Sequence, residues 1–206
     1  MNDHHRGTEE SKDVQADFTV ELEAGDEVLE IPWASEDESI RYRDLRRDPE
    51  LISEIPEAAA HPALRNFLRL INSGSIFFTA KCDAWFSRDL NPEEEILGTC
   101  KYGGYVDLVL ADEHNPAADL RASFAHHETL LKALVRELAS AAEIPASAEF
   151  IVRRCYFHDP AGEREGLYVT LYIFGYGSDE HVARGCWEQA LGVVQGALLK
   201  QRAPSA

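Results

Sequence analysis

Two similar segments of alternating apolar residues constrain the fold of this chain more than any other feature. Tyr105-Val-Asp-Leu-Val-Leu110 is matched further along by Tyr168-Val-Thr-Leu-Tyr-Ile173. Such alternation is the pattern of a strand with one buried face, and each segment precedes a stretch with helical spacing of its apolar residues. Each also follows a strand-like run that contains a cysteine. The sequence therefore predicts two hairpin–helix units in tandem.

The predicted fold class is α+β, with an antiparallel sheet built from the two units (ββα-ββα) and the helices on one face of it. An N-terminal hairpin and a short helix are expected to precede the units. We expect strands at 18–22, 28–33, 76–87, 97–111, 148–158 and 166–177, and helices at 49–54, 62–72, 118–142 and 179–201.

Composition separates an acidic N-terminal region from the rest of the chain. Residues 1–60 hold 18 acidic and 6 basic side chains and so carry −12 of the net charge of −17. This acidity argues against nucleic acid and membrane surfaces as partners, because both attract Lys and Arg. We expect a disordered tail at 1–16, an acidic hairpin and connection at 17–60 packed on the core, an α+β core domain at 61–201 and a frayed tail at 202–206.

Targeting segments and catalytic motifs are not found in the sequence. It has no run of 18 apolar residues to predict a membrane-spanning helix, and its polar start lacks the apolar part of a secretory signal. A cytoplasmic protein is therefore expected. The P-loop, the dinucleotide fingerprint and the nucleophile elbow are absent, so no cofactor is predicted. The sequence leans away from an enzyme without deciding the question.

One face of the predicted sheet is rich in aromatic side chains. Alternation leaves this face, opposite the helices, with Phe77, Trp85, Tyr105, Tyr168, Tyr172, Phe174 and Tyr176. If uncovered, it would exceed the apolar patch that monomers usually expose. Three arrangements would account for it: cover by residues 17–60, a homodimer or protein-partner interface, or a small-molecule pocket under the N-terminal segment.

Cysteine and histidine residues are the candidate metal ligands or catalytic groups. If the first hairpin turns near Asn91, Cys82 and Cys100 oppose each other and could form a disulfide or supply two metal ligands. Free core thiols are the simpler expectation, and no metal site is predicted. Helical geometry turns His127 into the apolar face of its helix and His126 away from it, which predicts one buried and one exposed histidine.

The function that the sequence favours is a non-enzymatic protein-binding module, chaperone- or adaptor-like, that uses the aromatic face. The alternative is a small-ligand-binding protein or enzyme with a pocket between the sheet and the N-terminal segment. Trp85, Tyr105, Tyr168 and Tyr172 would line that pocket, and Arg153 or His158 would add polarity. The candidate binding residues are Trp85, Tyr105, Tyr168, Tyr172, Phe174, Tyr176, Arg153 and His158.

From residue 62 onward, the expected order of helices and strands and the acidity resemble those of type III secretion chaperones. Those are small acidic homodimers that bind client proteins, so the resemblance implies a homodimer with a protein partner. No sequence motif carries the resemblance. This chain also has an additional N-terminal region of 60 residues.

Overall fold

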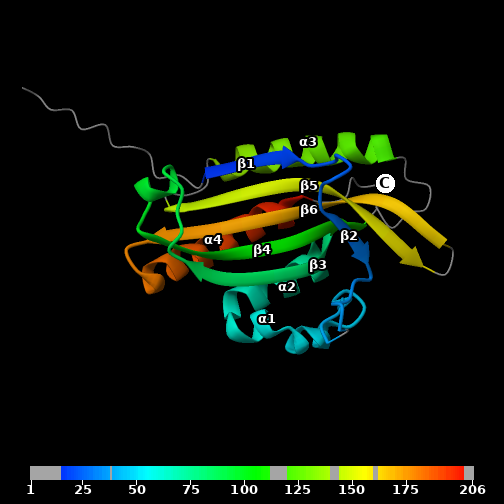
Figure 1. Ribbon diagram of the computed structural model, residues 1–206, viewed down its shortest axis with the longest axis horizontal. Coiled ribbons are helices and arrows are strands. Elements are labelled where there is room, and N and C mark those ends of the chain that lie inside the picture. Colours follow the sequence, from blue (N-terminus) through cyan, green and yellow to red (C-terminus); the bar gives the residue numbers. More distant parts are fainter. Residues whose placement is uncertain (1–14, 38, 112–119, 140–143, 160–161, 202–206) are drawn as a thin grey trace, which may run out of the picture.

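A mixed sheet of six strands forms the centre of the computed structural model (Figure 1). The structure describes residues 15–37, 39–111, 120–139, 144–159 and 162–201. The strands are β1 (Gln15–Val20), β2 (Val28–Ile31), β3 (Phe77–Ser87), β4 (Cys100–Leu110), β5 (Ala146–Asp159) and β6 (Gly162–Gly177). The helices are η1 (Pro49–Glu54), α1 (Pro56–Ala60), α2 (Pro62–Gly74), η2 (Glu94–Ile96), α3 (Leu120–Leu138) and α4 (Glu180–Lys200). The predicted α+β class is confirmed.

The strands lie in the order β1-β5-β6-β4-β3, and β2 also pairs with β5. The pairs β5/β6, β6/β4 and β4/β3 are antiparallel, whereas β1 and β2 run parallel to β5. The predicted N-terminal hairpin is therefore wrong, because β1 and β2 follow one another along the outer edge of β5 instead of pairing together. For the same reason the sheet is mixed, not purely antiparallel as predicted.

The predicted ββα-ββα repeat is not confirmed as an arrangement in space. The elements follow in that order along the chain, but the two units have different surroundings. The outer edge of β5 is covered by β1 and β2, whereas β3 forms the other edge of the sheet. Helix α4 packs on β6 and β4, while α3 contacts β1 as well as β6.

The face of the sheet that carries α2, α3 and α4 forms the main hydrophobic core (Figure 1). Helix α2 begins with Pro62, a residue suited to the first helical turn, and buries Leu64, Phe67, Leu68 and Ile71. Asp179 caps α4 by accepting a hydrogen bond from the Val182 N–H at 3.0 Å. The sheet contributes the side chains predicted for this face: Val106, Leu108, Leu110, Val169, Leu171 and Ile173.

A β-bulge at Ala80 changes which side chains of β3 face the helices. The pairing with β4 shifts register there, so that Ala80 is an extra residue in the strand. Ahead of the bulge, Phe77 lies in the helix-side core and Phe78 lies on the opposite face. The prediction that Phe77 faces away from the helices is therefore wrong, and Phe78 and Ala80 lie on that face instead. From Cys82 onward, the predicted alternation fits again.

A second, smaller core lies on the face of the sheet opposite the helices. There β2 contributes Leu29 and Ile31, and the connection that follows contributes the half-buried Trp33 and Tyr42. They pack on sheet side chains that include Phe78, Val109, Cys155, Phe157 and Tyr168. The segment from β2 to α1 then continues around the free edge of β3 (Figure 1). This path leaves only part of the face covered.

Candidate ligand-binding site

The aromatic face that the sequence predicts is divided into a covered and an open part. Tyr168 is only 1% exposed and lies in the second core beneath the N-terminal segment. Four half-buried rings stay outside that core, and each contacts two of the others, with centroid separations from 5.8 to 6.4 Å. We call them the aromatic patch: Trp85, Tyr105, Tyr172 and Phe174.

Tyr176 and His158, two further predicted binding residues, make contacts that have a structural explanation. The buried Tyr176 hydroxyl lies 2.8 Å from Ser147 Oγ and donates to Glu94 Oε1 at 3.0 Å. His158 is exposed near the end of β5, where its pairing with Glu30 raises the pKa of the imidazole. Neither residue belongs to the aromatic patch or lines the cavity described below.

Arg153 anchors a buried polar chain on the face opposite the helices. Its Nε donates to Glu21 Oε2 at 2.8 Å, and its Nη1 lies 3.2 Å from Glu27 Oε2. The same Nη1 donates to Thr170 Oγ1 at 3.0 Å, and Thr170 in turn donates to Asp107 Oδ1 at 2.8 Å. Burial raises the pKa of Asp107 to about 7, although the hydrogen bond from Thr170 favours the ionised form. Perturbed carboxyls of this kind cluster at functional sites.

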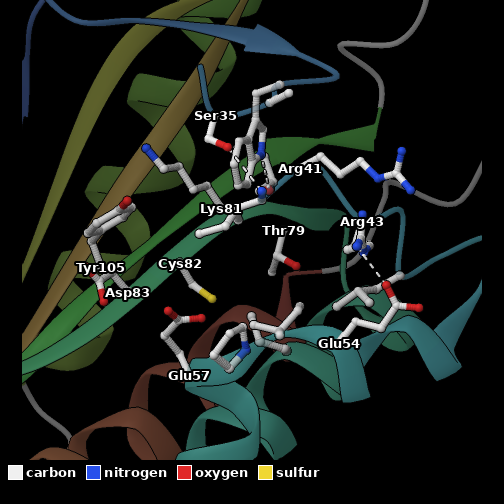
Figure 2. Close-up of a pocket in the computed structure, with 18 of the residues that line it drawn as sticks. Ser35, Arg41, Arg43, Glu54, Glu57, Thr79, Lys81, Cys82, Asp83 and Tyr105 are labelled. Atoms are coloured by element: carbon white, nitrogen blue, oxygen red, sulfur yellow. Dashed lines mark hydrogen bonds and ion pairs between the residues drawn. The ribbon is translucent and has the colours of Figure 1, made fainter. Parts of the chain in front are cut away.

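A cavity of about 410 Å³ lies at the free edge of β3, under the connection between β2 and α1 (Figure 2). Five successive residues of β3, from Thr79 to Asp83, contribute to its wall. Successive side chains of a strand point to opposite faces, so five in a row mean that the cavity borders the edge of the strand and its backbone. Residues from 33–35, 39–45 and 54–57 line its outer side.

Aromatic rings and a lysine form one wall of the cavity. The Lys81 ammonium lies 5.6 Å from the ring centroid of Trp33 and 5.9 Å from that of Tyr105, within the range of a cation–π contact. The Trp33 indole is fixed because its Nε1 donates to the Ala80 carbonyl oxygen at 2.8 Å. Among the residues that the structure describes, Lys81 has no ion-pair partner.

The remaining walls carry charges of both signs around an apolar part. Arg43 pairs with Glu54 at 2.7 Å across the end of the cavity remote from Tyr105 (Figure 2). Glu57 lies beside Cys82, and Arg41 points outward at the mouth (Figure 2). The apolar part of the lining includes Leu45, Ile55, Pro56 and Leu68. The arrangement suits a small ligand with apolar and charged groups.

The predicted opposition of Cys82 and Cys100 is wrong. In the sheet Cys82 pairs with Val106 of β4, and Cys100 pairs with Gly177 of β6. The hairpin turns near Glu94, within η2, further along the chain than predicted. All four cysteines are free thiols. In the described part of the chain, no group of three or more His, Cys, Asp or Glu side chains is placed to hold a metal ion.

Burial shifts the pKa values of Cys82 and His127, a possible nucleophile and a possible base. Burial, with the charge of Glu57 nearby, raises the pKa of the Cys82 thiol to about 12, and a protonated thiol is a weak nucleophile. Burial lowers the pKa of His127 to about 4, and its Nδ1 lies 2.9 Å from the Ser123 carbonyl oxygen. His126 is exposed, so the prediction of one buried and one exposed histidine is confirmed.

The sequence predicted only a small part of the cavity lining. Of the four side chains predicted to line a pocket, only Tyr105 does so, and Arg153 lies in the polar chain instead. Trp33 and Lys81 were missed. The neighbouring large rings Phe77-Phe78 indicate a strand covered on both faces, because alternation places them on opposite sides. No local pattern indicates which strand forms the edge.

No protein-family model, curated protein sequence or solved structure matches the chain. The resemblance to type III secretion chaperones therefore rests on the order of elements and on charge. Among the described residues, no helix is long and apolar enough to cross a membrane. Fold and site together define an α+β protein with a mixed sheet and a ligand-sized cavity at one edge. The cytoplasmic location and the absence of nucleic-acid partners stay predictions.

Proposed function

We propose that this protein binds a small polar ligand in the cavity at the edge of β3. The observation that carries the proposal is the cavity of about 410 Å³, which lies within the range of about 300–1,000 Å³ found for ligand pockets. Strand β3 of the central sheet forms one side of the cavity, and the connection between β2 and α1 forms the other. The ligand would therefore lie between the sheet and this connection.

The chemistry of the walls supports binding more than catalysis. Ligand pockets combine apolar and aromatic walls with a few polar groups that fix orientation. Here Trp33 and Tyr105 supply rings, and Lys81 supplies a cation without an ion-pair partner in the described residues. The thiol of Cys82, the nucleophile type nearest the cavity, is kept protonated by its raised pKa. The proposal therefore names a binding protein.

A fragment screen read by NMR tests the proposal. Binding fragments should shift the indole N–H signal of Trp33, since this group lies in the wall and donates to Ala80. Ile40, which is 56% exposed and lines the cavity, offers a blocking variant. Ile40→Trp should weaken the binding of these fragments at least about tenfold, whereas the control Ile96→Trp, at an exposed site outside the lining, should not.

Two outcomes of the screen would contradict the proposal. One is that no fragment shifts the Trp33 indole signal at millimolar concentration. The other is that Ile40→Trp binds the same fragments as tightly as the unsubstituted protein. Either result would remove the cavity as a binding site.

Protein binding through the aromatic patch is a second candidate function. It is favoured by the four contacting, half-buried rings, because Tyr and Trp are enriched in protein interfaces. Lys101 adds a cation 5.0 Å from the Phe174 ring centroid. For a homodimer, light scattering should give twice the monomer mass, and Trp85→Ser should return the protein to monomer. A monomer at the highest soluble concentration would contradict the homodimer form of this proposal.

A further inference from the structure

No described strand pairs with the outer edge of β3, and side chains form hydrogen bonds with some of its backbone groups instead. Unpaired backbone groups at an edge invite pairing with another chain, and proteins usually block them. Here side chains take up four of them. The bonds are Phe77 N–H to Ser75 Oγ (3.1 Å), Thr79 N–H to Asn72 Oδ1 (3.1 Å), Trp33 Nε1 to the Ala80 carbonyl oxygen (2.8 Å) and Ala84 N–H to Asp83 Oδ1 (2.7 Å).

Cys82 lies between these capped groups, and its backbone N–H and C=O point away from the sheet. The Asp83 carbonyl is directed at β4, since a Cβ atom placed on Gly104 would lie 1.9 Å from that oxygen. In an antiparallel edge strand, neighbouring residues direct their backbone groups to opposite sides. The groups of Cys82 therefore point outward, where Cys82 lines the cavity.

The outward N–H and C=O of Cys82 are both left uncapped by the described residues, at a point of the edge that faces the cavity. Within the described residues, no side chain caps the N–H or C=O of Cys82, although caps occur on both sides of it. The N–H and C=O of one residue in a strand are spaced to form hydrogen bonds with the C=O and N–H of another extended peptide. A hydrocarbon would use neither group, and a simple ion would use only one of them.

We infer that the cavity takes an extended peptide segment, which adds to the free edge of β3 and pairs with the N–H and C=O of Cys82. This inference rests on the proposed ligand-binding function and names the class of ligand. The added segment would lie about 4.8 Å from β3, the spacing of neighbouring strands. It would be short, because α1 and the connection close the cavity.

The side chains around Cys82 indicate the sequence of the peptide. The residue that pairs with Cys82 places its side chain on the same side as the Cys82 thiol, towards Ile55 and Leu68, and so should be apolar. Its two neighbours lie on the opposite side, one beside Lys81 and the other beside Asp83. An acidic neighbour for Lys81 and a basic one for Asp83 give the pattern acidic–apolar–basic, in an order set by strand direction.

Four peptides test the inference by isothermal titration calorimetry on the full chain. They are acetyl-Asp-Leu-Lys-amide, which fits a parallel segment, the reversed acetyl-Lys-Leu-Asp-amide, which fits an antiparallel one, and a methylated form of each. The methylated nitrogen is that of lysine in the parallel peptide and that of leucine in the antiparallel peptide. Methylation keeps the side chains and removes the N–H that the Cys82 carbonyl would accept. We expect one order to bind more tightly and its methylated form to bind at least about tenfold more weakly.

Lys81→Met separates the charge contact from the backbone pairing, because it keeps much of the apolar stem. It should weaken the preferred peptide about fivefold and leave acetyl-Ala-Leu-Ala-amide unchanged. Equal affinity of methylated and unmethylated peptides would overturn the inference. If fragments bind the cavity but no peptide does, the inference fails while the proposed function stands. If neither fragments nor peptides bind, both fail.

Discussion

The two edges of the sheet are protected in different ways. At the β5 edge, β1 and β2 pair in register with Ser147–Val152 and Arg154–Phe157 and so satisfy the backbone of most of the strand. At the β3 edge, individual side chains cap individual backbone groups. Cys82 lies between these caps and lines the cavity. The first edge is covered by paired strands, whereas the second has caps on four single backbone groups and leaves those of Cys82 open to the cavity.

This difference assigns two roles to one N-terminal segment. Its first part, β1 and β2, completes the sheet, and Arg153 ties the stretch between these two strands to the polar chain through Glu21 and Glu27. Its later part lines the cavity with residues from 33–35, 39–45 and 54–57, and none of its described residues pairs with β3.

Proline substitutions at neighbouring positions of β3 should give the largest contrast. The Asp83 N–H points to β4, so Asp83→Pro should lower the free energy of unfolding by about 5 kcal/mol. The Cys82 N–H points outward, so Cys82→Pro should lower it by only about 1 kcal/mol. Urea unfolding followed by circular dichroism measures both. Equal losses would show that the backbone of β3 is oriented differently.

Asp107 should make stability depend on pH in an unusual direction. Its pKa is about 7 in the folded protein against an ordinary value of 3.8, so the folded state binds the proton more tightly. The stabilisation is complete below about pH 4 and is lost as the pH rises to about 7. Asp107→Asn removes this titration and keeps an oxygen for Thr170 to donate to.

The effect of Asp107 on the free energy of unfolding is at most about 4 kcal/mol, because each tenfold difference in proton affinity between the folded and unfolded states is worth about 1.4 kcal/mol. Urea unfolding should be measured at about pH 4 and pH 8. Between these values, the free energy of unfolding of Asp107→Asn should rise relative to that of the unsubstituted protein by up to this amount. Asp83→Asn, at an exposed carboxyl of the same sheet, is the control and should show no such gain. Parallel pH profiles for both variants would count against the buried carboxyl.

Removing Arg153 should weaken the covered edge. Arg153→Met takes away the ion pairs with Glu21 and Glu27 and leaves Thr170 without its donor, which should lower the free energy of unfolding by about 3 kcal/mol. Arg154→Met is the matched control, with one hydrogen bond to the Glu23 carbonyl and an expected loss of about 1 kcal/mol. A loss as small as that of the control would mean that β1 and β2 hold the edge without this anchor.

The smallest expected effect is at the cap that Trp33 provides. Trp33→Phe keeps a ring over the edge of β3 and removes the hydrogen bond to Ala80, which should lower the free energy of unfolding by about 1 kcal/mol. Trp85→Phe, in the aromatic patch, is the control and should change stability less. If the two variants are equally stable, the indole N–H does not protect the edge.

Local sequence pattern predicted the elements, but the sheet edges depend on contacts that it does not encode. Alternation and helical spacing correctly placed β4, β6 and their helix-facing side chains, because burial of one face dictates those periods. Strands β1 and β2 looked like a hairpin because a turn separates them. Their actual partner, β5, lies more than a hundred residues further along the chain.

The candidate site was predicted even less completely, for two physical reasons. The bulge at Ala80 reverses the alternation in β3, so that Phe77 and Phe78 exchange faces and the predicted aromatic face loses one member. The cavity is also bordered by backbone, and backbone groups leave no residue signature in a sequence. The stacked rings of Tyr172 and Phe174 were within reach of sequence reasoning, because they follow from alternation alone.

Amide hydrogen exchange at Cys82, measured by NMR on the full chain, tests the open edge most directly. In the free protein, we predict that the Cys82 N–H exchanges at least about a hundredfold faster than that of Asp83, which bonds within the sheet. Saturation with the preferred acidic–apolar–basic peptide should slow exchange at Cys82 at least about tenfold. Protection of Cys82 equal to that of Asp83 in the free protein, or exchange unchanged by the bound peptide, would contradict the account.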